Sequence, residues 1–143
     1  MTATPPRLAF CFEAQVAIGP AQTVGATAHG KRRCIPILGG TVAGPRLQGQ
    51  ILPGEDWQLR RTDGVTEIDA RYVIEAADGA LVRVRSRGLL RDGGDPLRRY
   101  SRTMLTFDAP EGPLDWLVRS LFVADLAAGE APATVRLAVF EVL

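Results

Sequence analysis

The stretch IDARYVIEAADGALVRVRSRG, residues 68–88, decides the fold, because it shows two alternating segments around a turn at Ala77-Asp78-Gly79. A two-residue Asp-Gly loop and a three-residue loop with a left-handed Gly79 place different residues on each face of this hairpin. The three-residue loop is chemically cleaner, because it separates apolar from charged side chains. The apolar face then holds Ile68, Ala70, Tyr72, Ile74, Val82 and Val84, and the charged face holds Asp69, Arg71, Glu75, Arg83, Arg85 and Arg87.

The same period of two recurs along the chain. Leu8, Phe10, Phe12, Ala14 and Val16 alternate with more polar residues, and the segments 99–107 and 134–143 alternate in the same way. Gly39-Gly40 and Gly44-Pro45 predict breaks between short strands over residues 33–51. Leucine, valine and phenylalanine recur at helical spacing over residues 114–122, which allows one short helix.

These patterns predict an all-β protein. The chain has 143 residues, with 15 glycines and 10 prolines spread along it, so long helices have little room. About seven to nine strands form a sandwich or close into a barrel, and closure removes exposed sheet edges. We therefore predict one domain over residues 1–143, a single closed antiparallel β-barrel with at most one short helix.

Net charge and cysteine content narrow the classes of binding partner and the cellular compartment that we expect. Seventeen Lys and Arg against sixteen Asp and Glu give a net charge of +1, which removes the bulk electrostatic reason for binding nucleic acid or an anionic membrane. Cys11 and Cys34 are too few for a secreted disulfide framework and are expected to be free thiols. No secretory leader and no apolar run of about 18 residues is present. These features predict a cytoplasmic protein with no membrane partner.

The candidate site begins at Asp56 and Trp57, directly after the Pro53-Gly54 turn. A turn there would present a carboxylate and an indole together at the rim of a small-molecule pocket. Burial would raise the pKa of Asp56 and suit it to general acid–base catalysis. The alternative is a turn aspartate that caps its own backbone, with Trp57 filling the core.

Further candidates lie on predicted strands. Asp69 and Arg71 share one strand face, and Arg71 with Arg85 or Arg102 would clamp an anion if that face points inward. If it points outward, these charges form a solvated face. Tyr100 would donate a hydrogen bond to a developing oxyanion, and Trp116 would form an apolar wall, although both residue types more often fill cores.

His29 is the only histidine, so a multi-histidine metal site is excluded. Phosphate-binding and dinucleotide-binding glycine motifs are absent, and no serine lies in a nucleophile elbow. We therefore predict no metal and no cofactor.

Several segments in order resemble the bacterial and fungal proteins grouped as domain-of-unknown-function family 3237. The matching segments are residues 32–41, 44–49, 52–54, 56–58, 69–72, 78–81, 100–103 and 115–117, which together span nearly the whole chain. The resemblance implies a compact barrel similar to allene-oxide-cyclase-like barrels, a homo-oligomer, and no known bound cofactor. It implies no settled reaction.

The leading hypothesis is a cofactor-independent lyase, isomerase or cyclase that acts on a small carbonyl-bearing substrate. Its predicted catalytic residues are Asp56, Tyr100, Arg71 and Arg102, and its predicted substrate-binding residues are Trp57, Trp116, Asp69 and Arg85. The alternatives are a ligand carrier or sensor with the same pocket, and a structural oligomeric barrel whose interior is packed shut.

Overall fold

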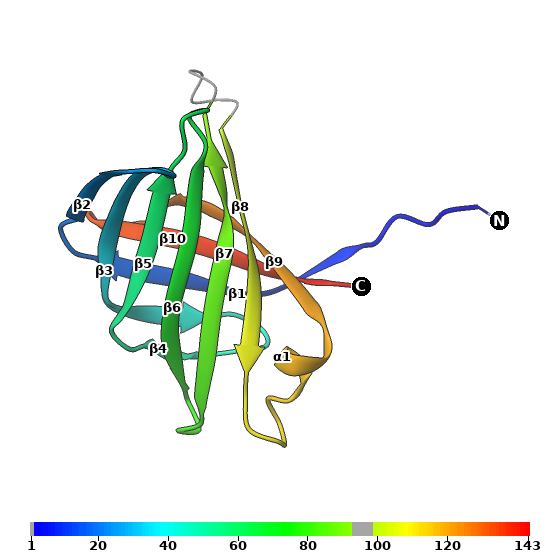
Figure 1. Cartoon of the computed structure of the whole chain (residues 1–143). Helices are drawn as coiled ribbons and strands as arrows, with labels where there is room; N and C mark the ends of the chain where they lie inside the picture. Colours follow the sequence, from blue (N-terminus) through cyan, green and yellow to red (C-terminus); the bar gives the residue numbers. More distant parts are fainter. Residues whose placement is uncertain (1, 93–98) are drawn as a thin grey trace.

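The computed structural model describes residues 2–92 and 99–143 and shows a barrel of ten strands with one short helix in that part of the chain (Figure 1). The strands are β1 (Leu8–Ile18), β2 (Gln22–Thr27), β3 (Gly30–Ala43), β4 (Gly49–Ile51), β5 (Gly54–Arg60), β6 (Thr66–Ala76), β7 (Leu81–Arg91), β8 (Tyr100–Asp108), β9 (Leu121–Ala128) and β10 (Thr134–Val142). The helix α1 spans Trp116–Arg119, a single turn. No helix among the described residues combines the length and the apolar character needed to cross a bilayer.

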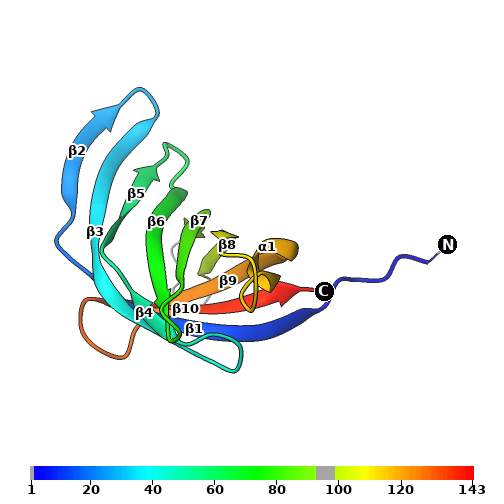
Figure 2. The ribbon, with the colours of Figure 1, turned by 90° about the horizontal axis from the view of Figure 1, so that it is seen from below.

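Eight of the strands close on themselves in the order β1-β10-β9-β8-β7-β6-β4-β3, because β3 also pairs with β1. All of these pairings are antiparallel. The remaining strands extend one end of the barrel: β2 pairs with the first part of β3, and β5 lies between β3 and β6 (Figure 2). The predicted closed antiparallel barrel with one short helix is therefore confirmed.

The β6–β7 hairpin has the predicted three-residue loop. Tyr72 pairs with Val84 and Ile74 pairs with Val82, and Gly79 has a left-handed φ of +89°. The apolar face of the hairpin points into the barrel and the charged face points outward. The choice made from side-chain chemistry is confirmed, because burying the alternative face would place arginines in the core.

The glycine pair in β3 does not break the strand as predicted. β3 runs unbroken from Gly30 to Ala43, and Gly39 and Gly40 have φ values of +151° and +157°. At this point the strand exchanges its partners β2 and β5 for β1 and β4. A Cβ atom on Gly40 would collide with the Gln15 carbonyl oxygen, so glycine allows β1 to approach and close the barrel.

The alternation predicted for the first strand holds only from Phe12 onward. The β1–β10 register shifts between Phe10 and Phe12, so the strand carries a bulge. Phe10 is left on the outside, where it packs edge-to-face on Phe140 with 5.7 Å between the ring centroids. The bulge also buries Cys11, which the simple alternation places among the more polar positions.

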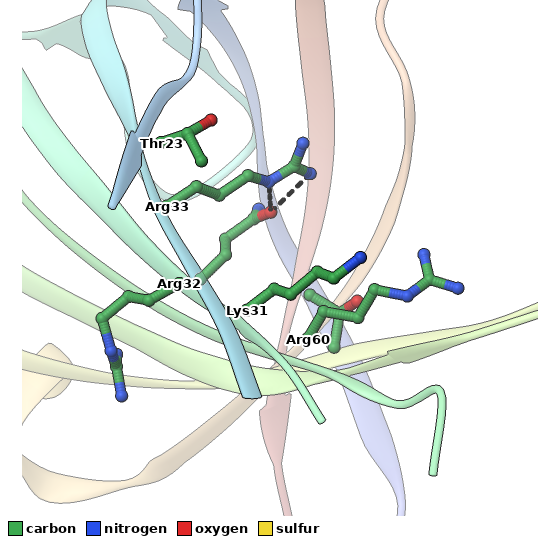
Figure 3. A pocket seen from close by; sticks show the side chains of 7 residues that line it. Thr23, Lys31, Arg32, Arg33 and Arg60 are labelled. Carbon is green, nitrogen blue, oxygen red and sulfur yellow. Dashed lines mark hydrogen bonds between the residues drawn. The ribbon is translucent and has the colours of Figure 1, made fainter. Parts of the chain in front are cut away.

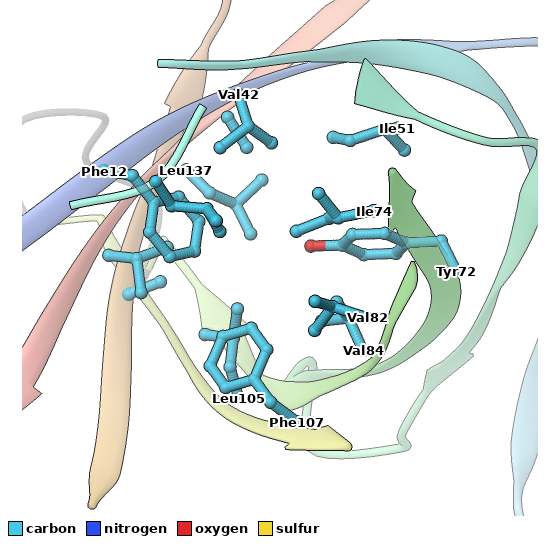
Figure 4. Close-up of a cluster of buried hydrophobic side chains, with 14 of the residues drawn as sticks. Phe12, Val42, Ile51, Tyr72, Ile74, Val82, Val84, Leu105, Phe107 and Leu137 are labelled. Carbon is cyan, nitrogen blue, oxygen red and sulfur yellow. The ribbon is translucent and has the colours of Figure 1, made fainter. Parts of the chain in front are cut away.

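One end of the interior, which we call the packed half, is filled with apolar side chains (Figure 4). Phe107 contacts Phe12 and Phe122 edge-to-face, at centroid distances of 6.2 and 5.1 Å. Trp116 of α1 packs on Phe122 at 5.7 Å and extends the ring stack beyond the strands. The packed half also contains Val42, Ile51, Ile74, Val82, Leu105 and Val139.

Candidate functional site

The other end of the interior, which we call the polar half, contains a small cavity of about 50 Å³. Its lining is mostly aliphatic, with Asp56, Tyr72 and Ser86 as the polar exceptions. The apolar lining comes from Val16, Ile18, Ile37, Ile68, Ala70, Leu126, Val135 and Leu137. A cavity of this size holds a few water molecules or one small chemical group.

Asp56 points into this cavity because of its place on β5. It pairs with Ile35 of β3 and Ala70 of β6, and Ala70 also lines the cavity. Its Oδ2 accepts a hydrogen bond from Nε2 of Gln58 at 2.8 Å. Its Oδ1 is buried and has no hydrogen-bond partner. The carboxylate therefore has one oxygen held in place and one available to a ligand.

Burial raises the pKa of Asp56 above that of an ordinary aspartate, and the hydrogen bond from Gln58 opposes part of this rise. The apolar lining is the physical cause, because it solvates a carboxylate poorly. A raised pKa makes the ionised carboxylate a stronger base. It also lets the protonated form persist to higher pH, where it can donate its proton.

A second side chain, Arg33, helps to orient the Asp56 carboxylate by holding Gln58 in place. Arg33 of β3 donates from Nε and Nη2 to Oε1 of Gln58, at 3.0 and 2.8 Å. This fixes the Gln58 amide so that its nitrogen faces Asp56. Arg33, Gln58 and Asp56 thus form one hydrogen-bonded chain that leads from the barrel mouth to the cavity.

Tyr72 supplies the other functional group of the cavity. Its ring is buried, and its hydroxyl points toward the barrel interior (Figure 4). Burial raises the pKa of Tyr72, so the phenol stays protonated and can donate a hydrogen bond. Ser86 lies on the same wall, since Ala70 of β6 pairs with it directly.

The turn that was predicted to present Asp56 and Trp57 together does not do so. Both residues lie in strand β5, and neighbours in a strand point to opposite faces. Trp57 is therefore on the outside, 40% exposed, and its Nε1 donates to Glu55 Oε2 at 2.8 Å. Asp56 also does not cap its own backbone.

Four more predicted site residues lie on the outer face. Asp69 accepts hydrogen bonds from Nε and Nη2 of Arg85 at 3.1 and 3.0 Å, and the Arg71 Nε lies 3.9 Å from it. This is the cross-strand pairing that the outward orientation predicts. Arg102 forms an ion pair with Asp125 at 2.6 Å. The pKa of Asp69 is lowered, chiefly by the Arg85 hydrogen bonds.

Tyr100 and Trp116 also lie away from the cavity. Tyr100 is on the outside, with the guanidinium groups of Arg91 and Arg102 at 4.6 and 5.8 Å from its ring centroid. Trp116 is at the packed end, beneath the Arg46 guanidinium at 3.8 Å. Of the eight predicted site residues, Asp56 alone lines this interior cavity, whereas Trp57, Asp69 and Arg71 line an open hollow of about 510 Å³ on the outer face. The roles assigned to these residues stay predictions.

The cavity brings in side chains that were not predicted as site residues, namely Gln58, Arg33, Tyr72 and Ser86. The period of two contained the signal for three of them. Gln58 lies two residues from Asp56 on one strand, and Tyr72 and Ser86 belong to the apolar face of the hairpin. Arg33 carried no such signal, because its contact with Gln58 depends on the pairing of β3 with β5.

Both cysteines are free and buried, as predicted, and burial raises the pKa of each thiol. Among residues 2–92 and 99–143, no group of three or more His, Cys, Asp or Glu side chains is placed to hold a metal ion.

Comparison with known proteins shows which family this chain belongs to and which solved structures share its fold. The model of a family described as "protein of unknown function (DUF3237)" matches residues 6–142. The chain belongs to this family. A UPF0311 protein of Bradyrhizobium diazoefficiens is 36% identical over 131 residues, which cover 82% of this chain and 86% of that protein. The crystal structure of a Rhodopseudomonas palustris protein of unknown function superposes with a TM-score of 0.89 at 32% identity, covering 99% of this chain and 100% of that one.

A more distant relative has a named activity. A Penicillium herquei protein called hydroalkoxylation enzyme phnH is 35% identical over 81 residues, which cover 57% of this chain and 54% of that protein.

Proposed function

We propose that this family member is a cofactor-independent enzyme that binds a small carbonyl-bearing molecule in the polar half and moves a proton with Asp56. The observation that carries the proposal is the buried, unpartnered Oδ1 of Asp56, in an apolar cavity whose lining also includes Tyr72. An ionised carboxylate that is desolvated and held from one side by Gln58 is suited to accept a proton from a bound substrate.

The named activity of the Penicillium herquei relative supports this chemistry. Hydroalkoxylation adds an alcohol O–H across a carbon–carbon double bond, which is an isomerisation when both groups belong to one molecule. The small cavity would hold the reacting group, with the rest of the substrate toward the barrel mouth. There, Asp56 would take the hydroxyl proton while the oxygen bonds to the β-carbon of an enone. The alkene electrons would move to the carbonyl oxygen, where Tyr72 would donate a hydrogen bond. Asp56 would then return the proton to the α-carbon, so atoms and charge balance.

The probe 1-(2-hydroxyphenyl)but-2-en-1-one tests the proposal, because its cyclisation to 2-methylchroman-4-one creates one stereocentre. The wild-type protein is expected to accelerate this cyclisation and to give one enantiomer in excess over the racemic background. Asp56→Asn is expected to lower kcat by at least about 100-fold, the usual contribution of a positioned acid–base group, with little change in probe binding.

The matched control is Asp63→Asn, an exposed carboxylate of the β5–β6 loop that forms an ion pair with Arg61, which is expected to leave the rate unchanged. Racemic product at the background rate, with the probe bound at saturation, would refute catalysis and favour a ligand carrier. Unchanged turnover in Asp56→Asn would remove Asp56 from the chemistry.

A further inference from the structure

The mouth of the polar half is positively charged on its inner surface. Lys31, Arg33 and Arg60 point to the same side of the β3–β5 pair as Asp56 (Figure 3), and we call these three residues the basic mouth. We propose that the basic mouth binds the carboxylate of an acidic ligand whose apolar body reaches into the cavity beside Asp56. This inference rests on the proposed small-molecule binding and adds a substrate class to it.

The basic mouth surrounds a cavity of about 250 Å³, larger than the one at Asp56. It is lined by Thr23, Lys31, Arg32, Arg33, Gln58, Arg60 and Thr66, a set without any Asp or Glu. Because Gln58 belongs to this lining and also donates to Asp56, the two cavities adjoin through one side chain. A ligand that spans both has its charged end at the mouth and its apolar end inside.

Of the three charges of the mouth, Arg33 interacts electrostatically with Asp56, whereas Lys31 and Arg60 form no ion pair with any described residue. Lys31 and Arg60 face each other directly across the β3–β5 pair, and like charges in this position destabilise a sheet. Arg33 donates to a neutral amide. The arginines of the outer face differ, since Arg85 and Arg102 are both neutralised by aspartates.

The contrast between the paired arginines of the outer face and the unpaired Lys31 and Arg60 indicates that the basic mouth binds an anion from outside the protein. A carboxylate between Lys31 and Arg60 would relieve their repulsion, and a guanidinium group matches the two oxygens of a carboxylate geometrically. The apolar lining beyond Gln58 favours an uncharged, largely hydrocarbon body.

Three acids and their amides test this inference by isothermal titration calorimetry: benzoate and benzamide, cinnamate and cinnamamide, and 2-naphthoate and 2-naphthamide. Each pair differs in charge at nearly constant shape. The wild-type protein is expected to bind at least one acid about tenfold more tightly than its amide, and added salt is expected to weaken the acid alone.

Lys31→Met combined with Arg60→Met is expected to bring the acid and the amide within about twofold of each other. The matched control is Arg119→Met. Arg119 lies in α1 at the packed end, where it forms an ion pair with Asp115, so its loss is expected to keep the acid preference. The charge-conserving pair Lys31→Arg and Arg60→Lys is expected to retain the preference and shows that the strands tolerate substitution.

Binding of none of the three acids, or equal affinity for acid and amide in the wild-type protein, overturns the inference. An equal loss of the acid preference in Arg119→Met overturns it as well, because the effect would then be one of net charge. Asp56→Asn separates this inference from the proposed catalysis. An acid preference that persists in Asp56→Asn, together with absent turnover in the wild-type protein, leaves the basic mouth valid and refutes the enzyme.

Discussion

The two halves of the barrel interior are built from the same strands and are both lined mainly by apolar side chains, but one is filled and the other leaves a cavity with a few polar groups. Along β6, the inward positions run from Ile68 and Ala70 at the cavity to the fully buried Ile74 in the packed half. Along β7, Ser86 gives way to Val84 and Val82. The comparison teaches that stability and ligand chemistry are separated along each strand, with tight apolar packing at one end and polar groups around a void at the other.

The largest expected difference comes from shortening one isoleucine in each half. Ile74→Ala is expected to lower the free energy of unfolding by about 3 kcal/mol, because it leaves a new void among fully packed neighbours. Ile68→Ala is expected to cost about 1 kcal/mol, since its side chain already borders a cavity. Urea denaturation followed by circular dichroism measures both. Equal losses would show that the two halves are packed alike.

Filling the cavity beside Asp56 tests the same comparison with the opposite change, an enlarged side chain. Ala70→Leu places a larger side chain beside Asp56 and is expected to weaken binding of 2-naphthoate at least about tenfold. The free energy of unfolding is expected to change by less than about 1 kcal/mol, because the added methyl groups enter existing space. Calorimetry and urea denaturation on the same sample check this. Unchanged affinity would mean that the ligand stays outside the cavity.

Asp56 is expected to reduce stability at neutral pH. Its folded-state pKa is raised, so its contribution to stability is complete below its unfolded-state pKa and is lost as the pH rises through the folded-state value. Asp56→Asn removes this loss. The variant is expected to be more stable than the wild type at pH 8, where the buried wild-type carboxylate is ionised. Thermal melts between pH 3 and pH 8, at about one-unit steps, measure the difference, which should shrink toward acidic pH. A constant difference would contradict the sign.

The smallest effect is expected on the outer face. The pKa of Asp69 is lowered by Arg85, so its contribution is present above its unfolded-state pKa and is lost as the pH falls through the folded-state value. Asp69→Asn is therefore expected to destabilise the protein at neutral pH, opposite in sign to Asp56→Asn. The pair is more than one-third exposed, at 35% and 39%, so the loss is expected to be only about 0.5 kcal/mol. The same thermal melts measure the stability of Asp69→Asn, and a variant more stable than the wild type at neutral pH would refute this prediction.

Much of the fold was predictable because it depends on local pattern. Alternation between Ile68 and Ile74 defines the strand and its buried face, and Gly79 sets the hairpin register. The bulge after Phe10 and the unbroken path through Gly39-Gly40 were not predictable. Both depend on how a strand meets partners that are distant in the sequence, and the local pattern carries no information about them.

The candidate site was predictable only in part. Asp56 was found because a carboxylate next to a turn and an indole is unusual, but the indole proved to be on the other side of the sheet. The outer-face arginines were predictable as a group, because the alternation of a strand places their charges on one face, but the sequence did not show that this face is the outer one. Arg33 and Lys31, which face inward, were hidden among ordinary cations of the same strand.

The sequence by itself determined that this chain forms alternating strands and which side chains of the β6–β7 hairpin share the apolar face. Such properties follow from the two-residue period of a strand, which is a local rule. Only the tertiary structure decided which end of the interior stayed hollow, that Asp56 faces it, and that Arg33, Gln58 and Asp56 meet in one hydrogen-bonded chain. The reason is that barrel closure and cross-strand register join residues from separate segments, and this geometry emerges when all strands pair at once.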